Sequence, residues 1–214
     1  MLGSMTVRGL AWLVLLAVLT GCGSASSPSP PSGVDELVIP TPSPDPADFT
    51  GTVDNPWFPL AAGTTWRYDV AEVTGTHRMV VTVAPGPTVD GVPTTARVAR
   101  EAGRRVVDWY AQDDRGNVWW FGRAGQWRAG VDGAEAGLAM AATPRVGDGY
   151  RTGYAAGVVE DTARVVSVDD QRVVVEESSV LEPGSAHQLT YEHGTGLVLD
   201  SDLEGAYRVV RLVP

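Results

Sequence analysis

The chain has 214 residues, of which 16 are basic and 26 acidic, and its formal net charge is −10. Apolar residues make up 43% and charged residues 20% of the chain, proportions that exclude a wholly disordered protein. The acidic balance argues against a nucleic-acid partner, which requires clustered positive charge. A single cysteine excludes an internal disulfide, so the fold must depend on packing.

The N-terminal segment has the features of an export signal. Arg8 precedes an apolar run over residues 10–19, which is too short for a membrane span of about 20 residues but is typical of a signal peptide. The motif Leu19-Thr20-Gly21-Cys22 follows and resembles the lipobox of bacterial lipoproteins. The resemblance implies cleavage before Cys22, a diacylglyceryl group on its thiol and an acyl chain such as palmitate on its new amine. The alternative is an ordinary secretory signal with an incidental cysteine.

The sequence therefore predicts three parts. Residues 1–21 form a lipoprotein signal peptide, and residues 22–53 form a lipidated cysteine and a Ser/Pro-rich tether, whose prolines favour an extended chain without a core. Residues 54–214 form one domain. We expect this domain to be extracytoplasmic and held to the cell membrane through Cys22, since two or three acyl chains give stable anchoring.

The domain has the sequence pattern of an antiparallel β protein. Short segments of alternating or β-branched residues recur every ~8–15 residues, and no long segment shows helical periodicity. We expect a single antiparallel meander sheet, curved into a half-barrel or closed as a lipocalin-like barrel. The expected strands cover residues 65–70, 79–83, 107–111, 118–121, 165–168, 173–175, 189–191, 197–199 and 207–212.

Turn signals connect several of these strands. The segment 113–117 contains Gly116 and predicts a hairpin between 107–111 and 118–121, and Asp169-Asp170 predicts a second hairpin between 165–168 and 173–175. Residues 133–142, rich in Gly and Ala, are the main exception to the β pattern. They could form one helical turn or a loop packed over the sheet.

Several motifs occur together in the domain: Asn55-Pro56-Trp57-Phe58-Pro59-Leu60, Asp108-Trp109-Tyr110-Ala111-Gln112-Asp113, and the segments 63–68, 116–122, 129–134 and 194–198. In this order they resemble a group of uncharacterised secreted bacterial proteins that open with N-P-(aromatic)-F-P-L and carry D-W-Y-A-Q-D. The resemblance covers nearly all of the domain. It implies secretion but assigns no reaction.

Candidate catalytic and metal-binding residues are few. The spacing of His187 and His193 matches no zinc signature, although one strand could place both near Asp200 and Asp202. The carboxylate pairs Asp113-Asp114, Asp169-Asp170 and Glu176-Glu177 fall in or beside expected turns, so we expect them to be solvated. No G-x-S-x-G elbow selects a nucleophile. We predict no catalytic residue, no metal and no cofactor, and hence a protein that is not an enzyme.

Aromatic residues gather in one region. Six fall between residues 109 and 127, and Trp119-Trp120-Phe121 places large rings on both faces of one strand. Exposed aromatic area of this size marks a ligand groove or a partner site, unless both faces are buried in the core. The residues that we expect to contact a ligand are Tyr68, Trp109, Trp120 and Trp127.

The sequence thus predicts a lipid-anchored, extracytoplasmic and non-enzymatic domain that binds an apolar or amphipathic ligand on an aromatic-lined sheet. The alternative is an interaction module for another envelope protein, with the same aromatic residues as its hot spots. A hydrolase is a third reading, for which no site can be named.

Overall fold

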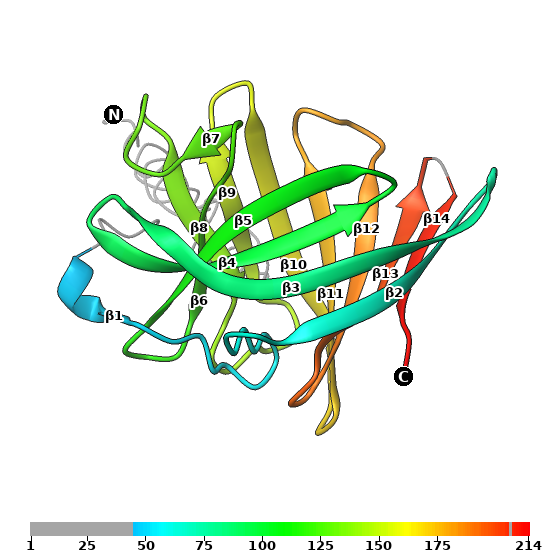
Figure 1. Cartoon of the computed structure of the whole chain (residues 1–214), viewed down its shortest axis with the longest axis horizontal. Helices are drawn as coiled ribbons and strands as arrows, with labels where there is room; N and C mark the ends of the chain where they lie inside the picture. The colour runs from blue at the N-terminus through cyan, green and yellow to red at the C-terminus, as the bar shows by residue number, and fades with distance from the viewer. Residues whose placement is uncertain (1–44, 206) are drawn as a thin grey trace, which may run out of the picture. The chain divides into compact units, whose positions relative to one another are not determined.

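The computed structural model describes residues 45–205 and 207–214 (Figure 1). The predicted signal peptide over residues 1–21, Cys22 and most of the predicted tether lie outside the described residues. The one helical element in the described part is the 3-10 turn η2 (Pro46–Asp48), where the carboxylate of Asp45 accepts a hydrogen bond from the amide of Ala47. The rest of the secondary structure consists of β-strands.

In the described residues, fourteen strands form one antiparallel sheet. They are β1 (Phe49–Thr50), β2 (Thr65–Glu72), β3 (Gly75–Val89), β4 (Val92–Glu101), β5 (Arg104–Asp113), β6 (Val118–Arg123), β7 (Trp127–Arg128), β8 (Glu135–Met140), β9 (Gly149–Ala155), β10 (Val159–Val168), β11 (Arg172–Ser179), β12 (Ala186–Glu192), β13 (Gly196–Glu204) and β14 (Arg208–Leu212).

The sheet closes into a barrel of twelve strands, β2–β6 and β8–β14. Each strand pairs with the next along the chain, β6 pairs with β8, and β14 returns to pair with β2 through Val210 opposite Val70. The short strands β1 and β7 attach to β5 and β6 beside the closed ring. The prediction of an antiparallel meander is confirmed, and of the two expected forms the structure has the closed one.

Both predicted hairpins are present. β5 and β6 pair around the turn that contains Gly116, whose φ of 87° suits glycine. β10 and β11 pair around Asp169, whose carboxylate accepts hydrogen bonds from the amides of Gln171 and Arg172, both at 2.8 Å.

The interpretation of residues 133–142 as a helical turn or loop was wrong, because most of this segment is strand β8. Ala136, Leu138 and Met140 alternate along it and are all buried. Gly137 faces the backbone of β9, and a Cβ at this position would lie 2.3 Å from the carbonyl carbon of Thr152. The small residues that weakened the β pattern therefore allow two strands to approach closely.

The folded unit begins before the expected boundary at Asp54. Phe49 and Thr50 pair with β5 as strand β1, and Val53 is buried in the core. Phe49 also packs edge-on against Phe121, with 5.2 Å between the ring centroids. These contacts place residues 49–53 in the domain rather than in the tether.

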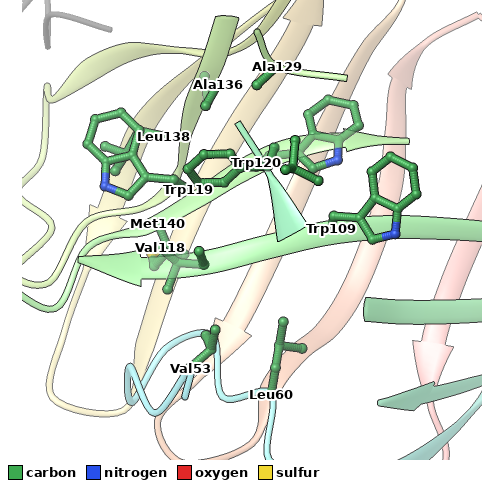
Figure 2. Packing of buried hydrophobic residues seen from close by; sticks show 14 of the residues in the cluster. Val53, Leu60, Trp109, Val118, Trp119, Trp120, Ala129, Ala136, Leu138 and Met140 are labelled. Atoms are coloured by element: carbon green, nitrogen blue, oxygen red, sulfur yellow. The ribbon is translucent and has the colours of Figure 1, made fainter. Parts of the chain in front are cut away.

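A large apolar cluster surrounds the β5–β6 hairpin. Trp109, Trp119, Trp120 and Phe121 are all buried, and Figure 2 shows the three indoles gathered with smaller residues such as Ala136. A second, smaller cluster contains Tyr68, Val70, Met79, Val81, Ala99 and Val210 on β2, β3, β4 and β14. The reading in which both faces of the aromatic strand are buried is therefore the one that the structure shows.

Residues 53–60, which we call the plug, close one end of the barrel. The Oε1 atom of Gln112 accepts hydrogen bonds from the amides of Asp54 and Asn55 at 2.9 and 2.8 Å. The amide of Gly194, in the β12–β13 turn, donates to the carbonyl of Pro56 at 2.7 Å. The plug is thus fixed to turns from two separate hairpins.

Candidate ligand-binding site

A polar cavity of about 250 Å³ lies inside the barrel. Its wall combines charged groups with aromatic and aliphatic side chains, drawn from the plug and from nine strands of the ring. The lining residues are Phe58, Arg97, Asp108, Tyr110, Trp120, Arg123, Ala139, Thr152, Asp161, Glu177, Leu189, Tyr191, Leu197 and Asp200.

One wall of the cavity carries two arginines, on β4 and β6. The Arg123 Nε lies 2.6 Å from Oδ1 of Asp108, whose side chain is almost fully buried, so this pair is neutralised within itself. Among the described residues, no carboxylate lies within 4 Å of the guanidinium of Arg97. Burial acts to lower the pKa of Arg97, but the nearby tyrosines and Asp108 outweigh it and raise the value. Arg97 therefore stays charged.

The facing wall carries the acidic residues Asp161, Glu177 and Asp200, on β10, β11 and β13. Burial, reinforced by the charge of Asp161, raises the pKa of Glu177 to about 7, while the Thr152 hydroxyl and His187 oppose the shift. The Glu177 carboxyl group thus exchanges its proton near neutral pH.

His187, beside these acids, pairs with two of the carboxylates on β13. Its Nδ1 lies 3.0 Å from Asp202 and 3.5 Å from Asp200. Hydrogen bonding to Asp200 is the main cause that raises the pKa of His187, with burial acting against it and both carboxylates adding to the rise. The acids of β13 consequently have an imidazole within 4 Å, whereas no cationic group of the described residues lies that close to Asp161 or Glu177.

Aromatic rings lie between the two walls. Phe58 of the plug packs against Tyr110 and Tyr191, with ring centroids 5.0 and 5.8 Å apart. Burial raises the pKa of both tyrosines, and charges from both walls act on each, since Arg97 lowers and Glu177 raises these values. Tyr110 and Tyr191 therefore keep their protons and remain neutral hydrogen-bonding groups.

Three buried polar atoms at or near the cavity have no hydrogen-bond partner in the described part of the chain. They are Trp127 Nε1, the Tyr150 hydroxyl and Thr152 Oγ1. Thr152 is 3% exposed and lines the cavity, and its hydroxyl affects the pKa of Glu177 without making a well-formed hydrogen bond. Unpaired buried polar groups are costly, so they mark a place where a further molecule can supply partners.

The four residues predicted to contact a ligand occupy different places. Trp120 lines the cavity, with the Arg123 guanidinium 5.1 Å from its ring centroid. Trp127 packs edge-on against Trp120 at 4.8 Å. Tyr68 lines an adjoining space of about 20 Å³ and donates to the carbonyl of Leu197 at 2.9 Å. Trp109 lies in the apolar core, away from the cavity lining.

The expectation that the Glu176-Glu177 pair is solvated beside a turn was wrong for Glu177. Both glutamates lie within β11, where adjacent side chains point to opposite sides. Glu176 pairs with Arg164 at 3.6 Å, whereas Glu177 lines the cavity. The alternation of Val173, Val175 and Glu177 was the signal that could have identified it.

A second group of titratable residues joins β2, β3, β4 and β14. His77 Nε2 lies 2.8 Å from Glu101, and the Arg208 guanidinium donates to both Glu101 oxygens at 2.9 and 2.8 Å. Glu72, His77 and Glu101 are close enough together to hold a metal ion. Because Arg208 already donates to both oxygens of Glu101, we interpret this cluster as an ion-pair network and not as a metal site.

Comparison with protein-family models, with curated proteins and with solved structures finds no match. In the described residues there is no helix with the length and apolar character needed to cross a membrane. The site therefore has to be interpreted from its own geometry.

Proposed function

We propose that this chain is a lipid-anchored, extracytoplasmic protein that binds a small amphipathic ligand inside its barrel and does not act as an enzyme. The observation that carries this proposal is the cavity of about 250 Å³, in which aromatic rings lie beside uncompensated charges. Sites for small molecules typically measure ~300–1,000 Å³ and combine apolar walls with a few polar groups, so a cavity just below this range suits a ligand at the small end. A wholly apolar ligand fits poorly, because it would desolvate the charges without pairing them.

The two ends of the barrel differ, and the difference supports entry of a ligand into the cavity from the end opposite the plug. The plug covers the end that carries the β5–β6 and β12–β13 turns. In a meander the connections alternate between ends, so the β2–β3, β9–β10, β11–β12 and β13–β14 connections share the opposite end. Most of the exposed large apolar residues lie in or beside these connections: Val73, Val158, Val180, Leu181, Leu203 and Tyr207. An apolar rim suits the passage of an amphipathic molecule.

The burial of the aromatic residues favours this proposal over an interaction module. Trp119 and Trp120 are 6% and 8% exposed, so neither offers an open surface to another protein. Hot spots of interfaces are aromatic residues that a partner can reach. Trp120, in contrast, borders the cavity and is available to a ligand inside the barrel.

Native mass spectrometry tests the proposal, with the full chain purified from cell membranes in lipid nanodiscs. We expect a small bound molecule that disappears from the variant Ala139→Trp, because Ala139 lines the cavity and an indole there fills it. Val158→Trp, in an exposed connection, is the matched control and should keep the bound mass. A wild-type protein without bound mass, or a mass that both variants retain, would contradict binding in the barrel.

The anchor is tested separately by cell fractionation. Cys22→Ser removes the thiol that would carry the diacylglyceryl group, so we expect the variant to leave the membrane fraction or to stay unprocessed. Two acyl signals hold a protein stably, whereas a single chain is marginal. If the variant sediments with membranes as the wild type does, lipidation at Cys22 is not what anchors the protein.

A further inference from the structure

We infer that the ligand is a small zwitterion whose anionic group binds Arg97 and whose cationic group binds Glu177 and Asp161. This inference rests on the proposed binding function and adds the chemical class of the ligand. It depends on where the two kinds of charge lie in the ring and on which of them are already paired.

Arg97 and Glu177 project into the cavity from opposite walls. β4 and β11 are six strands apart in both directions around the ring, through β5, β6, β8, β9 and β10 or through β3, β2, β14, β13 and β12. Figure 1 shows β3 and β4 across the front of the barrel and β10 and β11 on the wall behind them. Because both side chains line the same cavity, a ligand between them meets positive charge on one side and negative charge on the other.

The other charges around the cavity have partners of their own. Asp108 is paired with Arg123 at 2.6 Å, and Asp200 shares His187 with Asp202. Within the described ranges, neither Arg97 nor Glu177 has an oppositely charged group within 4 Å, and the same holds for Asp161. Arg97, Asp161 and Glu177 are half-buried, and charge that is partly removed from water is costly unless it is paired. The unpaired set is thus one cation facing two anions.

Among the described residues, no ion pair within 4 Å joins the two walls, although Asp161 acts at longer range on Arg123. The groups that act most on Glu177 are Asp161, Thr152, Asp200 and His187, all on its own wall, and Arg97 is not among them. Only the tyrosines between the walls, Tyr110 and Tyr191, are affected by both Arg97 and Glu177. Arg97 and Glu177 thus line one cavity of about 250 Å³ without pairing with each other, which leaves both free to bind a molecule that carries both charges.

The acidic wall suits an organic ammonium group better than a bare metal ion. In the part of the chain that the structure describes, the carboxylate oxygens of Asp161, Glu177 and Asp200 do not converge within 4.8 Å, as the ligands of one ion would. The unpartnered hydroxyl of Thr152 lines the cavity beside Glu177 and offers a further acceptor. An ammonium group has three donors, which can reach separate acceptors.

The space between the charges is bordered by Phe58, Trp120, Leu189 and Leu197. Aliphatic and aromatic side chains there favour a ligand with a short apolar body between its two charged groups. Aromatic faces also attract a cation that passes close to them. A chain of methylene groups with a carboxylate at one end and an ammonium at the other has these features.

The test uses ω-amino carboxylates of increasing chain length, titrated by calorimetry into the full chain in nanodiscs at pH 8. Each is compared with the alkylamine and the alkyl carboxylate of the same length. We expect one intermediate length to bind best, about tenfold or more tighter than either singly charged analogue, since a charge-assisted hydrogen bond contributes this much.

Two variants test which residue binds each charged group of the ligand. Arg97→Gln should remove the preference for the zwitterion over the alkylamine, and Glu177→Gln the preference over the carboxylate. Arg100→Gln, exposed on the same strand as Arg97, and Glu176→Gln, next to Glu177 and paired with Arg164, are matched controls that should keep both preferences. Circular dichroism confirms that each variant is folded.

Two results would overturn the inference. One is equal binding of the zwitterion and its singly charged analogues, and the other is failure of every ω-amino carboxylate to bind the folded wild type. A co-purifying mass in the native spectrum that depends on Ala139 would keep the binding function in either case. Its absence would reject the binding function itself, so the two failures can be told apart.

Discussion

The two sides of strand β6 differ in their chemistry. Trp119, Trp120 and Phe121 all belong to the apolar cluster, but Trp119 and Phe121 have no part in the cavity lining, whereas Trp120 and Arg123 border the cavity with its acids. The apolar side gains stability from close packing. The cavity side retains charges and polar atoms without partners, which cost stability in the absence of a ligand. Departures of this kind from a well-satisfied interior are expected at functional sites.

The largest effect should come from the apolar side. Phe121 is fully buried and packs against Phe49 at 5.2 Å, so Phe121→Ala leaves a cavity that the neighbours fill only in part. We expect a loss of about 3–5 kcal/mol in the free energy of unfolding, measured by urea denaturation. A loss below about 1 kcal/mol would mean that this side of β6 is not tightly packed.

The plug should be the next most sensitive region. Asn55 donates to the carbonyls of Gly116 and Ala141 at 2.9 and 3.2 Å and accepts from the amides of Trp57 and Phe58 at 2.9 and 3.1 Å. Asn55→Ala removes the partner of the Trp57 amide and the donor to both carbonyls, while the Phe58 amide keeps its bond to the carbonyl of residue 55, so we expect a loss of about 2–4 kcal/mol. Asn55→Asp keeps the accepted bonds but sets a buried carboxylate oxygen against the two carbonyls, so it should lose stability as well. Equal stability of all three proteins would show that the plug is not held by this side chain.

On the cavity side, a substitution should raise the free energy of unfolding instead of lowering it, and the gain should depend on pH. The pKa of Glu177 is raised from 4.5 to about 7 by burial and by Asp161, so its protonated form stabilises the fold fully below about pH 4.5. This contribution is lost as the pH rises to about 7. Glu177→Gln cannot ionise, so relative to the wild type it should gain about 1–3 kcal/mol between pH 4.5 and 8.

Thermal denaturation over this pH range measures the difference. Glu176→Gln serves as the control, because Glu176 pairs with Arg164 on the other side of β11 and should show no such gain. If the stability difference between Glu177→Gln and the wild type does not change with pH, then Glu177 is solvated and its pKa is not raised by the cavity wall.

The smallest effect is expected at His187, whose side chain is 40% exposed. Asp200 and Asp202 raise its pKa, so the protonated imidazole contributes stability that is fully present below about pH 6.5 and is lost as the pH rises through the raised value. Solvent screening limits this to about 0.5 kcal/mol. His187→Gln should therefore match the wild type at pH 9 and fall slightly below it at pH 5.5; NMR titration of the imidazole gives an independent check.

Much of the fold could be predicted because strands and turns depend on local patterns. Gly116 and Asp169 identified their hairpins, since the turn conformations they adopt are properties of a few neighbouring residues. The strand nature of β8 was missed because Gly137 is a poor strand former taken alone. Glycine is needed at this position because the backbone of Thr152 on β9 lies so close, and this contact between two strands cannot be inferred from the sequence of one of them.

The site was less predictable than the fold. Trp120 and the Phe58 motif were recognised by composition and resemblance, but Arg97 and Glu177 lie 80 positions apart in the sequence and carry no motif. Their meeting across one cavity depends on the pairing of β14 with β2 and of β6 with β8, which closes the ring. Strand alternation alone could have placed Glu177 on the side of Val173 and Val175, without showing that this side faces the interior.

By itself, the sequence determined that this is an antiparallel β protein with hairpins at definite positions, because alternation and turn chemistry are local. It also predicts export and an N-terminal lipid anchor from the motif that ends at Cys22. Only the tertiary structure decided that the aromatic hairpin is buried and that the acids of β10, β11 and β13 face Arg97 across a common cavity. The physical reason is that barrel closure sets which strand faces enclose the interior, and closure is a long-range pairing that no single segment encodes.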